Sequence, residues 1–359
     1  MYFCASTHTH MKNCYINGIG AVNIQPTDFD LFTTEINPLS NQNKAQQPSY
    51  KELIAPAMSR RMAKGVKMGI YAANEALKES KLQNIDAIIV GTGLGCIEDS
   101  EKFLDAIIEN DEQFLTPTSF IQSTHNTVAA QIALHLQCKA YNFTYVNGGN
   151  SFENALFDAF LQLKHLEKNE ILIGGVDEIA PYTFSMFEMI ERVKKVGEEL
   201  DFKNPTTAGV ALAEGATFFG LSTQKTNDSY AEVLDVMLFN AFNNDEETII
   251  TAFLAKHNLE ISAIDVVQFG INADLNQQEF YQKMTTIFKD TPQTYYQHIS
   301  GSYDTASAFG LKVAAEIIKK QVLPKTIQYN NIEPNKIEKV LLINQFNNTD
   351  FSFVLLQSC

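Results

Sequence analysis

Apolar residues along the chain follow two patterns: short continuous runs that end near glycine, and longer stretches with helical spacing. The runs 14–20 (CYINGIG), 87–90 (AIIV) and 170–175 (EILIGG) have the length and composition of strands. We predict helices over 59–79, 128–136 and 151–165, where apolar side chains recur every three or four residues. Helices that alternate with buried strands predict an α/β fold.

Two distant segments repeat one pattern. NIDAIIVGTGLG begins at Asn84 and AIDVVQFGINAD at Ala263, so that Asp86 and Asp265 each precede an apolar run that ends at glycine. A further helix is predicted over 306–320. An internal repeat explains the match, although two ordinary buried strands of an α/β protein would also produce it. We predict two halves, 11–225 and 226–359, and an upstream extension over 1–10, because Met11 directly precedes the first strand.

Composition excludes several classes of function. The 359 residues are 45% hydrophobic, enough for a large core, and carry a formal net charge of −15. Nucleic acids and anionic lipids are recruited by basic clusters, so we expect neither as a partner. No apolar run approaches membrane-spanning length, and the five cysteines are scattered without ligand spacing. We therefore expect a reduced, cytoplasmic protein without membrane insertion, metal or cofactor.

The turn in YVNGGNSFENALFDAF (145–160) has the form of a nucleophile site, because a glycine turn leads directly into a helix. It contains no thiol. Ser151 lacks the glycine two places later that a serine elbow requires, since Glu153 stands there. GTGLG after the strand 87–90 departs from the dinucleotide fingerprint. His125 and His298 lie in polar turns before helices, and no histidine pair has helical metal-site spacing.

Several motifs, in order, resemble those of the β-ketoacyl-acyl-carrier-protein synthases of the thiolase superfamily. They are YINGIGAV, MSRRMAKGVKMGIYAANEAL, IIVGTGLG, ILIGGVDE and GVALAEGATFF, which keeps the glutamate of the family's GEGA segment at Glu214. The resemblance covers nearly the whole chain from residue 12 to 358. It implies a thiolase-like, five-layered αβαβα fold built from two pseudo-repeated halves.

The resemblance also locates the positions of the catalytic groups. The family's nucleophilic cysteine falls on Gly149, and the histidine of its HGTGT turn falls on Gly270. The lysine and histidine of its KSxxGH turn fall on Gln297 and Ser302. Glycine has no side chain with which to attack a thioester or move a proton, so Claisen condensation by this chain alone is not expected.

Silent members of this family act as chain-length factors beside an active ketosynthase. The resemblance therefore implies a non-catalytic subunit that partners an active ketosynthase, or itself in a homodimer, and works with an acyl carrier protein, in a fatty-acid or polyketide-type pathway such as aryl-polyene or flexirubin pigment synthesis. Substrate-tunnel or interface positions are then Phe120, Ile121, Gln122, His125 and the gating phenylalanine, Phe346. The alternative is a divergent ketosynthase or acyltransferase that uses Asn147, Ser151 or His298.

Overall fold

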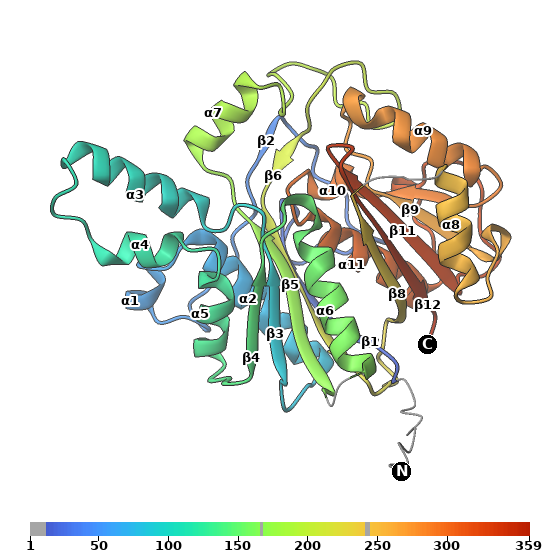
Figure 1. Cartoon of the computed structure of the whole chain (residues 1–359), viewed down its shortest axis with the longest axis horizontal. Coiled ribbons are helices and arrows are strands. Elements are labelled where there is room, and N and C mark those ends of the chain that lie inside the picture. Colours follow the sequence, from blue (N-terminus) through green and yellow to red (C-terminus); the bar gives the residue numbers. More distant parts are fainter. Residues whose placement is uncertain (1–11, 166–167, 241–244) are drawn as a thin grey trace, which may run out of the picture.

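A mixed ten-stranded sheet forms the centre of the protein (Figure 1). The computed structural model describes residues 12–165, 168–240 and 245–359, so the predicted extension over 1–10 lies outside the described residues. The strands of this sheet are β1 (Tyr15–Val22), β3 (Ala87–Gly91), β4 (Tyr141–Tyr145), β5 (Glu170–Asp177), β7 (Gly215–Ser222), β8 (Ala231–Phe239), β9 (Val266–Phe269), β10 (Gln293–Tyr295), β11 (Lys339–Phe346) and β12 (Asp350–Gln357). A separate two-stranded ribbon pairs β2 (Gln42–Asn43) with β6 (Leu212–Ala213).

The strand order shows the internal repeat. It runs β10-β9-β11-β12-β8-β1-β7-β5-β3-β4, which is two mirrored sets of five joined at β1 and β8. β3 pairs in parallel with β4 and β5, as β9 does with β10 and β11. The two matching sequence segments thus supply β3 and β9 at equivalent places. The boundary near residue 225 falls between β7 and β8 and stays a prediction.

Helices fill the layers around these strands. Their bounds are α1 (Pro56–Ser59), α2 (Lys64–Ser80), α3 (Ile97–Glu109), α4 (Pro117–Ser123), α5 (Thr127–His135), α6 (Ser151–His165), α7 (Pro181–Met189), α8 (Glu246–Ala255), α9 (Gln278–Ile287), α10 (Gln297–Ser300) and α11 (Ala306–Lys320), with 3₁₀ turns η1 (Gly148–Asn150), η2 (Ile261–Ala263), η3 (Leu275–Gln277) and η4 (Lys325–Ile327).

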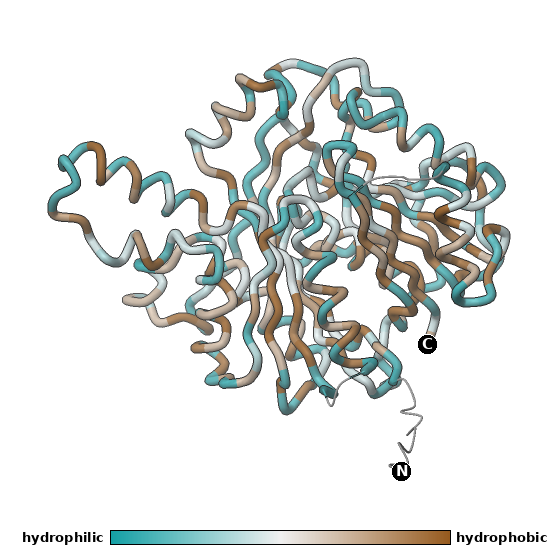
Figure 2. The backbone as a smooth tube through the Cα atoms, in the orientation of Figure 1, coloured by the Kyte–Doolittle hydropathy of each residue, from teal (hydrophilic) through white to brown (hydrophobic). Residues whose placement is uncertain are grey.

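The helices and the two halves of the sheet make five layers. α6 contacts β3 and β5 on one side and β8 on the other, and α11 contacts β5, β7, β11 and β12, so both helices lie between the halves. α2 and α5 cover the outer face of the first half, and α8 and α9 pack on that of the second (Figure 1). Figure 2 shows that the hydrophobic stretches follow the strands. The thiolase-like, layered α/β fold is therefore confirmed.

Backbone contact between α2 and β1 depends on glycine. A Cβ atom on Gly20 would lie 2.1 Å from the Ala72 carbonyl oxygen, so a larger residue would force the helix away from the strand. The helices predicted over 151–165 and 306–320 match α6 and α11. The one predicted over 59–79 begins only at Lys64, because Ala63 is extended (ψ 154°) and donates its N–H to Gln122 Oε1 at 3.1 Å.

No helix within the described ranges combines the length and the apolar character needed to cross a membrane.

Candidate functional site

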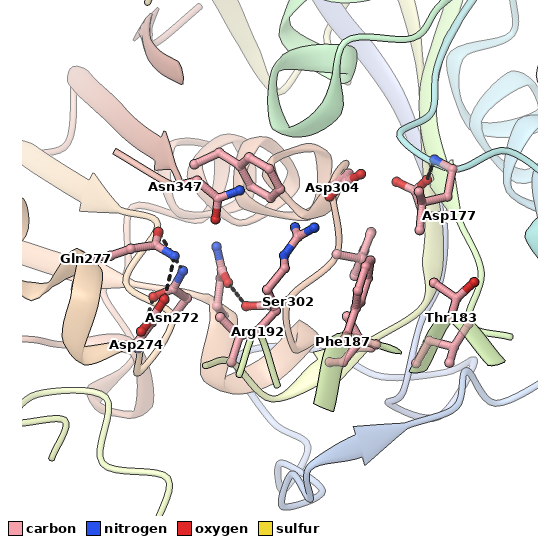
Figure 3. A pocket seen from close by; sticks show the side chains of 18 of the residues that line it. Asp177, Thr183, Phe187, Arg192, Asn272, Asp274, Gln277, Ser302, Asp304 and Asn347 are labelled. Carbon is pink, nitrogen blue, oxygen red and sulfur yellow. Dashed lines mark hydrogen bonds between the residues drawn. The ribbon is translucent and has the colours of Figure 1, made fainter. Parts of the chain in front are cut away.

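A cavity of about 300 Å³ lies where several parallel strands of both halves end (Figure 3). Its walls come from the segments that follow β3, β5, β9 and β11, together with α7, β6 and the loop between α10 and α11. In open α/β sheets the carboxyl ends of parallel strands are the usual place for a ligand site. Of the four cysteines that the structure describes, none lines this cavity.

The turn before α6 keeps the form of a nucleophile site. β4 ends at Tyr145, and Gly148 adopts a left-handed φ of +49° as the chain turns into α6. Ser151 Oγ donates to the Gly148 carbonyl oxygen at 2.7 Å and accepts the Asn147 N–H at 2.8 Å, which holds the turn. Gly149 is buried at the position that the resemblance gives to the nucleophile.

The side chain of Phe346 fills the space that a nucleophile would need. A Cβ atom on Gly149 would lie 2.2 Å from Phe346 Cγ and 2.4 Å from its Cβ. The turn after β11 forms with Asn347 and Asn348 in the left-handed region, at φ 52° and 56°. Asn348 Nδ2 also donates to the Asn276 carbonyl oxygen at 2.7 Å. This turn and its hydrogen bonds hold Phe346 against Gly149.

Hydroxyl and amide groups occupy the positions of the family's histidines and lysine. A Cβ atom on Gly270 would lie 2.5 Å from Asn344 Oδ1. The Gly270 carbonyl oxygen accepts hydrogen bonds from Tyr281 OH at 2.7 Å and Gln297 Nε2 at 3.2 Å. Ser302 Oγ donates to Gln297 Oε1. Gly270, Gln297 and Ser302 are thus brought together, in a hydrogen-bonded network without an imidazole.

Glu153 lies beside this network, on the first turn of α6. Its side chain is 1% exposed, and its Oε1 accepts hydrogen bonds from Ser352 Oγ at 2.9 Å and Asn344 Nδ2 at 3.4 Å. Its second oxygen, Oε2, is buried without a hydrogen-bond partner. Burial raises the pKa of this carboxyl to about 7, because desolvation penalises the charged form more than its hydrogen bonds favour it.

Replacing Glu153 with glutamine is expected to stabilise the protein at pH 8 but not at pH 5. The carboxyl pKa is 4.5 in the unfolded chain and about 7 in the folded one, so the folded state keeps a proton that the unfolded state releases. The contribution of this group to the free energy of unfolding is fully present below pH 4.5. It falls by on the order of 3 kcal/mol as the pH rises to 7. Urea unfolding of both proteins across pH 4.5–8 measures the difference.

Glu101→Gln is the matched control for this experiment. Glu101 is also buried, yet it accepts hydrogen bonds from the backbone N–H groups of Tyr182 and Thr183 and from the Thr183 hydroxyl, at 2.6–3.1 Å. Its amide variant should be destabilised at pH 8. A Glu153→Gln protein as sensitive to pH as the wild type would contradict the role given to Glu153.

Of the five candidate tunnel or interface residues, all but Phe346 lie outside the cavity. Phe120 and Ile121 are more than half exposed on α4, at 55% and 53%. Gln122 is buried beneath them, bonded to Ala63, and His125 is exposed beside Gly95. Their proposed part in a tunnel or interface stays a prediction. Phe346 lines the cavity, as do Gln297 and Ser302.

The other candidate groups of the sequence do not meet at this site. Ser151 is buried and bonded within its own turn, and His298 packs against Tyr295 with ring centres 4.1 Å apart. Burial lowers the pKa of His298 to about 4. The GTGLG loop is held by Asp177 Oδ1, which accepts the N–H groups of Gly93 and Leu94 at 2.8 and 3.1 Å. This carboxylate occupies the N–H groups that a phosphate would need.

Charged residues of the cavity that were not predicted from the sequence include Arg192 and Asp304. Arg192 reaches the cavity from the segment after α7, and Asp304 from the loop before α11 (Figure 3). Neither belongs to a recognisable motif. Asp304 lies two residues after Ser302 in a turn already singled out, which was the only local signal. Among the described residues, no group of three or more His, Cys, Asp or Glu side chains is arranged to hold a metal ion.

Comparison with known proteins identifies the family. Residues 35–257 match a family model described as "Beta-ketoacyl synthase, N-terminal domain". A search among curated protein sequences gave no match.

Solved structures agree in fold. The ishigamide ketosynthase/chain length factor is 16% identical, with a TM-score of 0.78, over 97% of this chain and 100% of that one. A β-ketoacyl synthase from Burkholderia phymatum STM815 is 14% identical, with a TM-score of 0.79 and the same coverage. A ketosynthase in complex with its chain length factor from Xenorhabdus doucetiae is 13% identical, with a TM-score of 0.72, over 100% of both chains. This chain belongs to the β-ketoacyl synthase family.

Proposed function

We propose that the protein is a non-catalytic, chain-length-factor-like subunit that acts beside an active β-ketoacyl synthase. The observation that carries the proposal is the Phe346 ring in the space of the missing nucleophile at Gly149. The groups at and around the positions of the family's histidines and lysine support it, because Tyr281, Gln297 and Ser302 bond to one another or to the backbone and none of them is an imidazole or an amine. The likeness to ketosynthase/chain length factor structures is consistent with this role.

Chemistry on a growing acyl chain would then take place on the partner. An acyl carrier protein would deliver the chain, and this subunit would shape the space available to it. A ketosynthase has also been solved with its acyl-carrier protein and a bound hexaketide, and its fold matches this chain at a TM-score of 0.73. A polyketide-type or aryl-polyene pathway in the cytoplasm is the setting that we propose.

The free edge of the sheet is the surface that we propose for the partner. β4 lies at the end of the strand order, so one side of its backbone has no neighbouring strand in the described chain. Tyr141 and Phe143 stack on its surface with ring centres 6.0 Å apart, and both are more than 40% exposed. Val146, which follows β4, and Phe157 and Leu161 on α6 are also exposed. Such an apolar group on an unpaired edge is typical of a surface that is covered in an assembly.

The projecting pair α3 and α4 carries further exposed apolar side chains. The pair extends from the body of the protein at one side (Figure 1), and its ribbon includes hydrophobic stretches (Figure 2). Phe120 packs on Phe103 with ring centres 5.4 Å apart but stays half exposed. In the segment from α3 to α4, the exposed apolar residues also include Leu104, Ile108, Phe114 and Ile121. A partner that covered both β4 and α4 would bury the interface residues proposed from the sequence.

Placing a charge on β4 is expected to abolish assembly. Phe143→Asp would put a carboxylate in the centre of the proposed interface, where desolvation costs several kcal/mol, enough for a hundredfold or greater loss of affinity. Co-purification with the partner, followed by sedimentation velocity, measures the loss. Val322→Asp, at a residue 51% exposed outside these elements, is the control. Equal recovery of partner with both variants would exclude β4 from the interface.

Affinity purification from the native cell tests the function itself. The tagged protein should bring down a cysteine-bearing ketosynthase in equal amount, and the mixture should condense malonyl-carrier. Changing the partner's cysteine should stop the reaction, whereas Ser151→Ala and His298→Ala should leave it unchanged. A protein that comes out alone and turns over an acyl thioester would instead be a divergent enzyme.

A further inference from the structure

Arg192 enters the cavity without a direct ion pair in the described part of the chain. Its guanidinium lies over the ring of Phe187 at 4.4 Å and over that of Phe346 at 5.6 Å. Within the part of the chain that the structure describes, it has no ion pair and no side-chain hydrogen bond. The two rings hold the plane of the guanidinium, while its N–H groups are free to meet a planar anion such as a carboxylate.

Asp304 is the unpaired opposite charge of the same cavity. Its carboxylate rests over Gly93, where a Cβ atom would lie 1.8 Å from Oδ2, so only glycine leaves room for it. Burial and the neighbouring charge of Asp177 raise its pKa to about 7, and Arg192 opposes that shift. In the described residues it receives no hydrogen bond.

Asp177, a second carboxylate of the same cavity, accepts a full set of hydrogen bonds, in contrast to Asp304. Its two oxygens accept five hydrogen bonds, from the Thr92 hydroxyl, the Gly93 and Leu94 N–H groups, and the hydroxyl and N–H of Thr305. The contrast sets Asp304 apart as a group that lacks a donor. Partly buried charges without partners are costly, and in a cavity of about 300 Å³ they are typical of a ligand site.

Gly149, the position that the resemblance gives to the nucleophile, does not line the cavity, although Gln297 and Ser302 do. Phe346 lines the cavity and contacts Gly149. Amide side chains line the rest of the wall on the side of the second half, including Asn272, Gln277 and Asn347 (Figure 3). A ligand here would be held by its polar groups, and no cysteine of the described residues lines the cavity.

We propose that this cavity binds a small molecule that carries a carboxylate at one end and a hydrogen-bond donor, an ammonium or a hydroxyl group, at the other. Arg192 receives the carboxylate and Asp304 the donor. The two side chains are not paired with each other, so a bifunctional ligand satisfies both at once. This goes beyond the proposed function, which concerns the acyl chain on the partner, because the small molecule would be a separate ligand of this subunit.

Calorimetric titration with simple probes tests the site. The probes are ω-amino and ω-hydroxy carboxylates with two to five methylenes, each compared with the plain carboxylate and the plain amine of the same length. We expect at least one bifunctional probe to bind saturably and at least tenfold more tightly than either plain compound. The amino and hydroxy series distinguish the two donors.

Two variants assign the ends of the ligand. Arg192→Gln should weaken binding of the bifunctional probe about tenfold or more, and Asp304→Asn should remove its advantage over the plain carboxylate. Arg61→Gln and Asp290→Asn, at exposed residues outside the cavity, should leave binding unchanged. Failure of every bifunctional probe to saturate the wild-type protein would overturn the proposal. Binding of the bifunctional probe that both cavity variants leave unaltered would also overturn it. A third contradicting result would be a cavity that shows no preference for bifunctional probes but binds pantetheine, the thiol arm of an acyl carrier, equally in the wild type and in both variants.

Discussion

Replacing Gly149 with cysteine is expected to destabilise the protein, by about 1–3 kcal/mol or more, without creating a reactive thiol. The new Cβ would lie 2.2 Å from Phe346 Cγ and 2.4 Å from Phe346 Cβ. A rotation of the ring cannot relieve the second contact, so the turn after β11 would have to move. That turn is held by Asn348, which bonds to Asn276. Urea unfolding and the rate of thiol labelling measure the two effects.

A double-mutant cycle separates the clash from other causes. Phe346→Ala should leave space at Gly149, so the double variant Gly149→Cys/Phe346→Ala should lose less stability than the two single changes predict together. Its thiol should also label faster than that of Gly149→Cys alone. A single Gly149→Cys protein that is as stable as wild type and labels rapidly would show that Phe346 does not occupy the nucleophile's space in solution.

Lys64→Met is expected to cost about 3–5 kcal/mol, because it leaves a buried carboxylate without its cation. Lys64 Nζ lies 2.6 Å from Glu214 Oε2, and the Glu214 side chain is 1% exposed. Glu214 also accepts the N–H groups of Ile179 at 2.9 Å and Ala45 at 3.1 Å, so it ties three segments together. The free energy of unfolding in urea at pH 7 measures the loss.

A surface ion pair of the same kind provides the control. Lys102 is 2.8 Å from Glu98, but its side chain is 59% exposed, and Lys102→Met should cost less than about 1 kcal/mol. Adding Glu214→Gln to Lys64→Met should recover part of the lost stability, because the buried carboxylate without a cation is then replaced by a neutral amide. Similar losses for Lys64→Met and Lys102→Met would contradict the importance given to burial.

Local sequence patterns were sufficient for much of the fold. The helices 151–165 and 306–320 have continuous helical spacing and were found with their observed bounds. The start of α2 could not be found in this way, because it depends on Gln122, which is 59 residues away from Ala63. The matching segments around Asp86 and Asp265 predicted the internal repeat, because strands in equivalent positions of the two halves need the same apolar run.

The contents of the cavity depend on contacts between distant parts of the chain. The four altered positions were found by family resemblance, but what fills their space was not foreseeable. Gly149 contacts a ring from the far end of the chain, and Arg192 and Asp304 share a cavity only because the segment after α7 and the loop before α11 meet there. Neither contact leaves a local pattern in the sequence.

The hydrogen-bonded network around Gly270 has a consequence for how this chain can change. Active sites commonly hold strained or unsatisfied groups, and folds that carry them give up some stability for activity. Here the carbonyl oxygen of Gly270 accepts hydrogen bonds from Tyr281 and Gln297, and Ser302 donates a hydrogen bond to Gln297. Under the proposed non-catalytic role, we expect these hydrogen-bonded groups to favour stability over activity, and the protein to tolerate more substitutions on its binding surfaces than a catalytic relative would.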